Sequence, residues 1–135
     1  MTFKDSLKTK DFVVTAHLNM VDVSDAKSLI QQAEIVKPVV DGVQVTDSIQ
    51  EPIGGVAAAA ILIQQGIDPI VHMNCRDRNR IALEKDFMGA TALGVTSVLI
   101  RRGQKILKSP KVGIKNVFDT TALEFMAYIN SLKED

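Results

Sequence analysis

The chain has 135 residues, of which 46% are hydrophobic and 24% charged, a balance typical of one globular domain with a hydrophobic core. Sixteen basic residues offset sixteen acidic ones, which argues against a nucleic-acid or membrane partner, and the longest apolar run, Val56–Ile63, is far too short to span a bilayer. The single cysteine, Cys75, cannot form an internal disulfide, and the polar N-terminus lacks the apolar stretch of a signal peptide. We therefore expect one soluble, cytoplasmic domain over residues 1–135.

The first part of the chain predicts two strands with a helix between them. Phe12–Leu18 is a short, mostly apolar run with β-branched residues, as in a buried strand. Asp25–Val36 places its apolar residues on one helical face, with Ser24 as a plausible N-cap and Pro38 closing the helix. Gly42–Thr46 predicts the second strand.

The same alternation continues to the end of the chain. We expect helices over Gly54–Gln65 and Asn79–Leu93, strands over Pro69–Met73 and Val95–Ile100, and a last helix capped by Asp119 or Thr120. Four strand–helix units in a row predict an α/β fold with a parallel sheet and right-handed crossovers. The spacing alone does not distinguish an open sheet from part of a barrel.

Polar side chains follow all four predicted strands. In both architectures ligands bind outside the carboxyl ends of the strands, so these side chains predict one shared pocket. The candidates are His17 after the first strand, Thr46 and Asp47 after the second, His72 in the third, and Arg102, Gly103 and Gln104 after the fourth.

Several of these residues also have a purely structural interpretation. His17 and His72 could be core histidines that donate to backbone carbonyls, and with Cys75 they are too few and too irregularly spaced to predict a metal site. We expect no metal. Arg101 and Arg102, followed by a glycine that lets backbone approach a ligand, suit phosphate or carboxylate binding.

Two longer stretches resemble one family. His72–Leu83 reads HMNCRDRNRIAL and Gly89–Val95 reads GATALGV, similar to the H-x-T-C-R-D-R-N stretch and the G-A-x-x-L-G turn of the methylenetetrahydrofolate reductases. The resemblance extends over about residues 8–132. It implies an α/β fold that forms the parallel (βα)4 N-terminal half of a TIM-type barrel.

The resemblance also implies a function. In this family FAD carries a hydride from a nicotinamide cofactor to 5,10-methylenetetrahydrofolate, giving 5-methyltetrahydrofolate. The positions that would contact FAD are Thr46, His72, Arg102 and Gly103. Those that would lie near the folate are His17, Asp47 and Gln104.

The sequence departs from the family pattern at both acidic positions. His17 stands where the family has its general acid, a glutamate, and Gln104 stands where an aspartate follows the glycine. General acid catalysis contributes about 10² to 10⁴ in rate, so we expect weak or no reductase turnover by this chain alone. The alternative is a non-catalytic subunit that uses the same strand ends to bind a folate-type or phosphate-bearing ligand, or serves in assembly.

Four strands are half the number in a TIM-type barrel, which needs about 250 residues. The first and fourth strands would each keep an unpaired edge, and Phe12–Val14 and Val98–Ile100 carry little of the charge or proline that protects such edges. We therefore expect a homodimer, or a partner subunit, that completes the barrel.

Overall fold

A computed structural model describes residues 1–107 and 113–132 of the chain. Its four strands are parallel and lie side by side in chain order: β1 (Thr15–His17), β2 (Gly42–Val45), β3 (Pro69–Asn74) and β4 (Ser97–Arg101). In register, His17 lies beside Gln44, and Asn74 lies beside Arg101. The expected parallel α/β sheet is confirmed.

The predicted helices are present, with small shifts at their ends. They are α2 (Ala26–Val36) with a short 3-10 turn η1 (Lys37–Val39), α3 (Gly55–Gln64), α4 (Arg80–Ala92) and α5 (Ala122–Ser131). The expected caps were wrong by one or two positions in two cases. Asp25, rather than Ser24, accepts a hydrogen bond from the Ser28 amide. Thr121, rather than Asp119 or Thr120, caps α5 in a reciprocal capping box with Glu124.

The predicted first strand was too long at its N-terminal side. Phe12 is 80% exposed and lies before β1, outside the paired residues. The chain is instead attached to the sheet at Val14, whose amide donates to the Asp41 carboxylate and whose carbonyl accepts from the Asp41 amide. An apolar run therefore predicted the strand, but pairing starts only where β2 is available as a partner.

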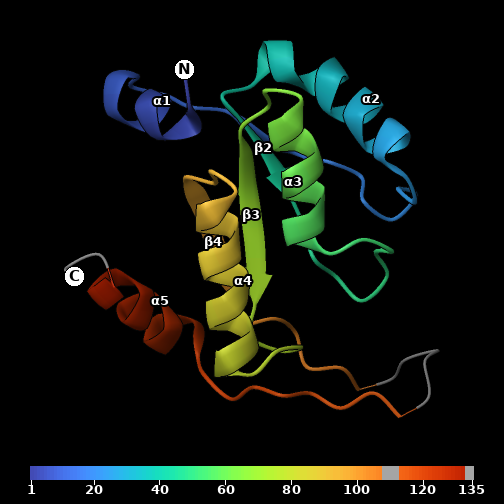
Figure 1. The fold of residues 1–135 in the computed structure, drawn as a ribbon, viewed down its shortest axis with the longest axis vertical. Coiled ribbons are helices and arrows are strands. Elements are labelled where there is room, and N and C mark those ends of the chain that lie inside the picture. The colour runs from blue at the N-terminus through green and yellow to red at the C-terminus, as the bar shows by residue number, and fades with distance from the viewer. Residues whose placement is uncertain (108–112, 133–135) are drawn as a thin grey trace.

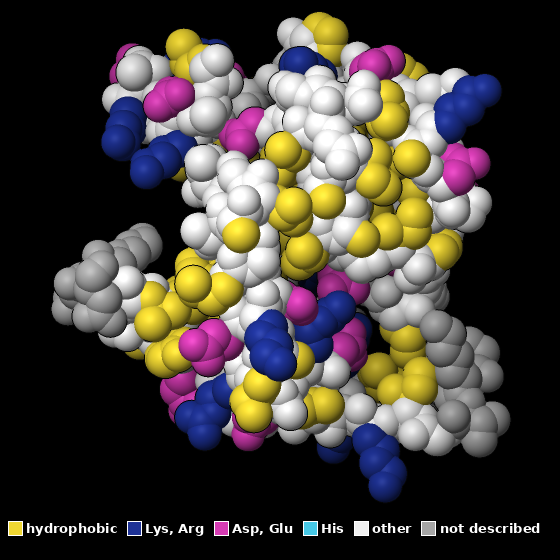
Figure 2. Space-filling model, in the orientation of Figure 1, with side chains coloured by type: hydrophobic (Ala, Val, Ile, Leu, Met, Phe, Trp, Pro, Cys, Tyr) yellow, Lys and Arg dark blue, Asp and Glu magenta, His cyan; other side chains and the backbone are white. Residues whose placement is uncertain are grey.

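One side of the sheet carries the hydrophobic core. Because strand side chains alternate between faces, Val43 and Val45 of β2 and Val71 and Met73 of β3 point to the same side. Buried residues of the helices pack on them, namely Leu29 and Ala33 of α2, Ala58, Ala59 and Leu62 of α3, and Leu83 and Ala90 of α4. In Figure 1, α3 and α4 lie in front of the strands and form this cover. Figure 2 shows the same side, where hydrophobic side chains gather over α3 and charges of both signs gather near the lower end of α4.

The opposite face carries a helix at its N-terminal end. A helix that the sequence did not predict, α1 (Phe3–Thr9), lies near the ends where the strands begin (Figure 1). Phe3 and Ile70 fill the space beside Gly42, where an added Cβ would lie 2.9 Å and 2.7 Å from their side chains. The Phe3 amide also donates to Asp68 at 2.9 Å. Beyond α1, this face of the sheet continues to the carboxyl ends of the strands.

Within the described residues, no helix is both long and apolar enough to cross a membrane.

Candidate functional site

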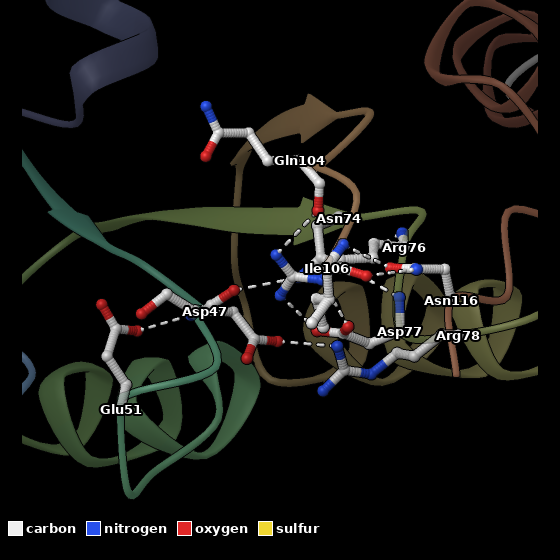
Figure 3. Close-up of polar contacts among 10 residues, drawn as sticks. Asp47, Glu51, Asn74, Arg76, Asp77, Arg78, Gln104, Ile106 and Asn116 are labelled. Carbon is white, nitrogen blue, oxygen red and sulfur yellow. Dashed lines mark hydrogen bonds and ion pairs between the residues drawn. The ribbon is translucent and has the colours of Figure 1, made fainter. Parts of the chain in front are cut away.

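The carboxyl ends of the four strands meet at one edge of the sheet, where the sequence placed the pocket. Asn74, the last residue of β3, connects two of them. Its side-chain amide donates to the Asp47 carbonyl at 2.9 Å, and its Oδ1 accepts from the backbone amides of Arg76 and Asp77 at 3.1 Å each. Figure 3 shows Asp47, Asn74 and Gln104 around this point. The hydrogen bonds of Asn74 therefore connect the ends of β2 and β3.

Arg76 connects β3 with the segment after β4. Its guanidinium is buried and pairs with Asp77 at 2.6 Å and 2.9 Å, and it donates to the Gln104 carbonyl at 3.4 Å. Gly103 lies against it with φ +84°, and an added Cβ there would be 2.8 Å from the Cβ of Arg76. Glycine at 103 is thus required by close packing within the chain itself.

Asp47 is held by an arginine from the start of α4. Arg78 bridges Asp47 at 2.8 Å and Asp86 at 2.9 Å. Burial raises the pKa of the Asp47 carboxyl above its usual value, although Arg78 acts in the opposite direction. This ion pair fixes the loop after β2 against α4 and leaves Asp47 with less freedom to meet a ligand.

Thr46 directs its hydroxyl into the loop that follows β2. The hydroxyl donates to Glu51, which also accepts from the Ser48 amide at 2.9 Å. The Thr46 carbonyl lies 3.7 Å from the position that a Cβ on Gly55 would occupy, so the first turn of α3 packs closely behind it. Glu51 adds a carboxylate to this edge that the sequence-based set of site residues did not contain.

The two histidines lie together on the face that the helices leave uncovered. The ring centroids of His17 and His72 are 5.2 Å apart, with the rings nearly perpendicular. His72 is 4% exposed, and its Nε2 is 2.6 Å from Oε1 of Gln44. The Gln44 amide donates in turn to the Thr15 hydroxyl at 2.7 Å. The second ring nitrogen of His72, Nδ1, is buried and has no hydrogen-bond partner in the part of the chain that the structure describes.

His72 is held in its neutral form. Burial lowers the pKa of its imidazole to about 4, and the nearby His17 and Arg101 act in the same direction. This histidine is therefore uncharged at neutral pH. Its contact with a ligand depends on which nitrogen carries the hydrogen.

Arg102 and Gln104 follow β4 and have different surroundings. The Arg102 guanidinium stacks over the Phe118 ring at 4.8 Å, and Phe118 itself has a φ of 42°. Gln104 is exposed, and Figure 3 shows its side chain extending away from the Arg76 cluster. Neither side chain has an ion pair or side-chain hydrogen bond within residues 1–107 and 113–132.

The structure brings the predicted residues into two groups. His17 and His72 form one, on the uncovered face, while Asp47, Gly103 and the Gln104 backbone form the other, around Asn74 and Arg76. The sequence reasoning missed Gln44 and Asn74 as site residues. A signal for Gln44 was present, because it is the one polar residue between Val43 and Val45 and must point away from the apolar face.

Cys75 is free and buried, and burial raises the pKa of its thiol, as for a small packing residue. In the described part of the chain, no three His, Cys, Asp or Glu side chains are grouped so that they could hold a metal ion.

The chain is similar to one known family of proteins. The chain matches the family model described as methylenetetrahydrofolate reductase over residues 17–135, which is most of its length. None of the curated proteins compared with it matches. The four parallel strands in chain order are those of part of a TIM-type barrel, as that family requires. By this match, the chain belongs to the methylenetetrahydrofolate reductase family.

Proposed function

We propose that this chain forms the N-terminal half of a flavin- and folate-binding site of the methylenetetrahydrofolate reductase type. Thr46, His72, Arg102 and Gly103 would hold FAD, and His17, Asp47 and Gln104 would lie near the folate. The observation that carries the proposal is the unpartnered Nδ1 of the buried His72, next to the exposed His17, on a sheet face that the helices leave open. A buried polar atom without a partner is costly, and a ligand would supply one.

The bound FAD would supply hydride transfer between a nicotinamide and the methylene bridge of the folate. The part of this chain in the reaction is to bind, orient and protonate. His17 is the exposed imidazole at the end of β1, and it would be the proton donor that stands where the family has its glutamate. Gln104 offers a neutral amide where the family has a negative charge, so stabilisation of a positive ligand group is lost. We propose weak turnover or binding without turnover.

FAD titration tests this function. We expect a flavin that binds but is lost on gel filtration, because Gln104 stands where the family has an aspartate near the ligands. Arg102→Ala should weaken binding about tenfold, since it removes a cation without an ion pair, and Arg80→Ala is the matched control. Arg80 is 71% exposed and pairs with Asp119 at 3.5 Å, outside the proposed site.

Absence of any flavin binding, or equal effects of the two arginine variants, would contradict the assignment of FAD to this edge. Binding of folate without flavin would instead favour the non-catalytic ligand-binding subunit.

We also propose that a second copy of the chain completes the barrel. In the described sheet, β1 and β4 each pair on one side only. Pairing of β4 with β1 of another copy, in both directions, gives eight parallel strands and leaves no open edge. An apolar groove between α4 and α5, lined by Phe87, Val98 and Ile129, lies beside β4 and offers room for the partner's helices.

Light scattering at micromolar concentration measures this directly. We expect the mass of two chains, and Val98→Asp, which places a charge in the groove beside β4, should shift the mass to one chain. The control is Val39→Asp, at an exposed position on η1, outside the paired residues of both edge strands. A mass of one 14.7 kDa chain for the unmodified protein would contradict the dimer.

A further inference from the structure

Three polar side chains from neighbouring strands form a directed hydrogen-bond chain on the uncovered face. The Gln44 amide nitrogen donates to the Thr15 hydroxyl at 2.7 Å, which leaves the Gln44 carbonyl oxygen facing His72. That oxygen lies 2.6 Å from Nε2 of His72. A carbonyl oxygen only accepts, so the hydrogen of this bond must be on Nε2.

The protonation of Nδ1 follows from that of Nε2. A neutral imidazole carries one N–H, and burial keeps His72 neutral, with its pKa lowered to about 4. Nδ1 is therefore a bare acceptor at neutral pH. It is buried and has no partner among the described residues, which therefore leave this acceptor unsatisfied.

A donor stands on the same face. Asn74 pairs with Arg101 in the sheet, and His72 is two residues before Asn74, so Arg101 and His72 point to the same side. The Arg101 charge lies close enough to act on His72. Arg101 has no ion pair within the described residues. The same face therefore carries an acceptor, Nδ1, and a guanidinium that only donates.

We propose that Gln44 is a positioning residue that fixes His72 as its Nε2–H tautomer, and that Nδ1 and Arg101 together recognise the N–H and C=O of a ring lactam. This edge is shared by flavins and pterins, and it complements the acceptor and donor. An anionic oxygen would meet the lone pair of Nδ1 and be repelled there. The ligand class in this proposal rests on the proposed function, whereas the tautomer of His72 does not.

The exposed ring of His17 lies beside the buried ring of His72. It lies 5.2 Å from the His72 ring at the end of the short edge strand β1.

Nitrogen-15 NMR of the ring nitrogens in the ligand-free protein tests the tautomer. We expect His72 to carry its hydrogen on Nε2, and Gln44→Leu to produce a mixture of tautomers. Thr15→Val is a milder second variant, because it removes only the acceptor that orients the Gln44 amide. Gln31→Leu, at an exposed position on α2, is the control and should leave His72 unchanged. A hydrogen on Nδ1 in the unmodified protein, or no response to either Gln44→Leu or Thr15→Val, would overturn the positioning role.

Ligand titration tests the lactam contact. The probes are riboflavin and folate, each against its analogue methylated at the lactam nitrogen N3. For the ligand that binds, we expect methylation to weaken binding about tenfold, because Nδ1 then loses its donor. His72→Phe should abolish the difference between the methylated and unmethylated probes. If methylation weakens the binding of riboflavin, the lactam belongs to a flavin. If it weakens the binding of folate, the lactam belongs to a pterin.

Equal affinity for methylated and unmethylated probes would overturn the lactam contact and leave the proposed function standing. If neither riboflavin nor folate binds, both the lactam contact and the proposed function fail, whereas the tautomer result is decided separately by NMR.

Discussion

The two faces of the sheet are built from the same strands and have opposite properties. On the helix-covered face, Val45 and Val71 are fully buried against α3 and neighbouring helices. On the other face, Gln44 and His72 alternate with them along the same strands and form hydrogen bonds to each other. The covered face therefore holds the hydrophobic core, and the other face carries the polar side chains on which the proposed binding site rests.

The largest difference between the two faces is expected when one leucine side chain is truncated on each of them. Leu62 of α3 is fully buried in the core, whereas Leu99 of β4 is 37% exposed on the other face. Leu62→Ala should cost about 2–5 kcal/mol of unfolding free energy, through lost burial and a cavity. Leu99→Ala should cost less than about 1 kcal/mol. Urea unfolding measures both. Similar losses would mean that the second face is as tightly packed as the first.

Acid should act mainly through the uncovered face, because His72 is buried there in its neutral form. Its pKa is lowered from 6.5 to about 4. As pH falls below about 6.5, the unfolded chain takes up a proton at this residue and the folded chain does not, so folding stability falls until about pH 4. The loss amounts to about 3 kcal/mol at 1.36 kcal/mol per pKa unit.

Urea unfolding of His72→Gln between pH 4 and 7 measures this contribution. The variant should lose less stability with acid than the unmodified protein by that amount. His17→Gln removes one cause of the lowered pKa and should reduce the loss only in part. An unchanged pH dependence in His72→Gln would show that His72 titrates as an exposed histidine does.

The same contrast between the two faces of the sheet explains which strands and helices the sequence predicted correctly. Runs such as Pro69–Met73 and the apolar face of residues 26–36 predicted strands and helices, because burial on the covered face imposes a period on the sequence. Phe12 followed that pattern and was still misassigned, since an apolar residue does not reveal whether a neighbouring strand reaches it. The helix α1 was missed because its short, polar sequence lacks a periodic signal, although its capping box is local.

The site was predictable in position but not in its contacts. Residues after the strands were identified from the rule that parallel strands end at one edge. The Thr15–Gln44 and Gln44–His72 bonds join residues 29 and 28 positions apart, and only the register of the strands brings them together. The ion pair of Asp47 with Arg78 likewise depends on how α4 approaches β2. Chain order predicts which strand carries a residue, but the partner of each side chain depends on packing.

The smallest expected effect is the difference in stability between two glycine-to-alanine substitutions. Gly103 and Gly113 both have positive φ, +84° and +80°, but they differ in their surroundings. An added Cβ at Gly103 would lie 2.8 Å from the Cβ of Arg76, and one at Gly113 would meet nothing within 4 Å. Gly113→Ala should therefore cost only the strain of the left-handed backbone, about 1 kcal/mol. Gly103→Ala should cost about 2–3 kcal/mol, because it adds the clash with a buried, ion-paired arginine to that strain. Unfolding of the two variants in parallel separates the terms, since the strain is common to both. Equal losses would mean that Arg76 moves aside freely, and the hydrogen bonds that connect β3 to the segment after β4 would then not hold the edge in a fixed shape.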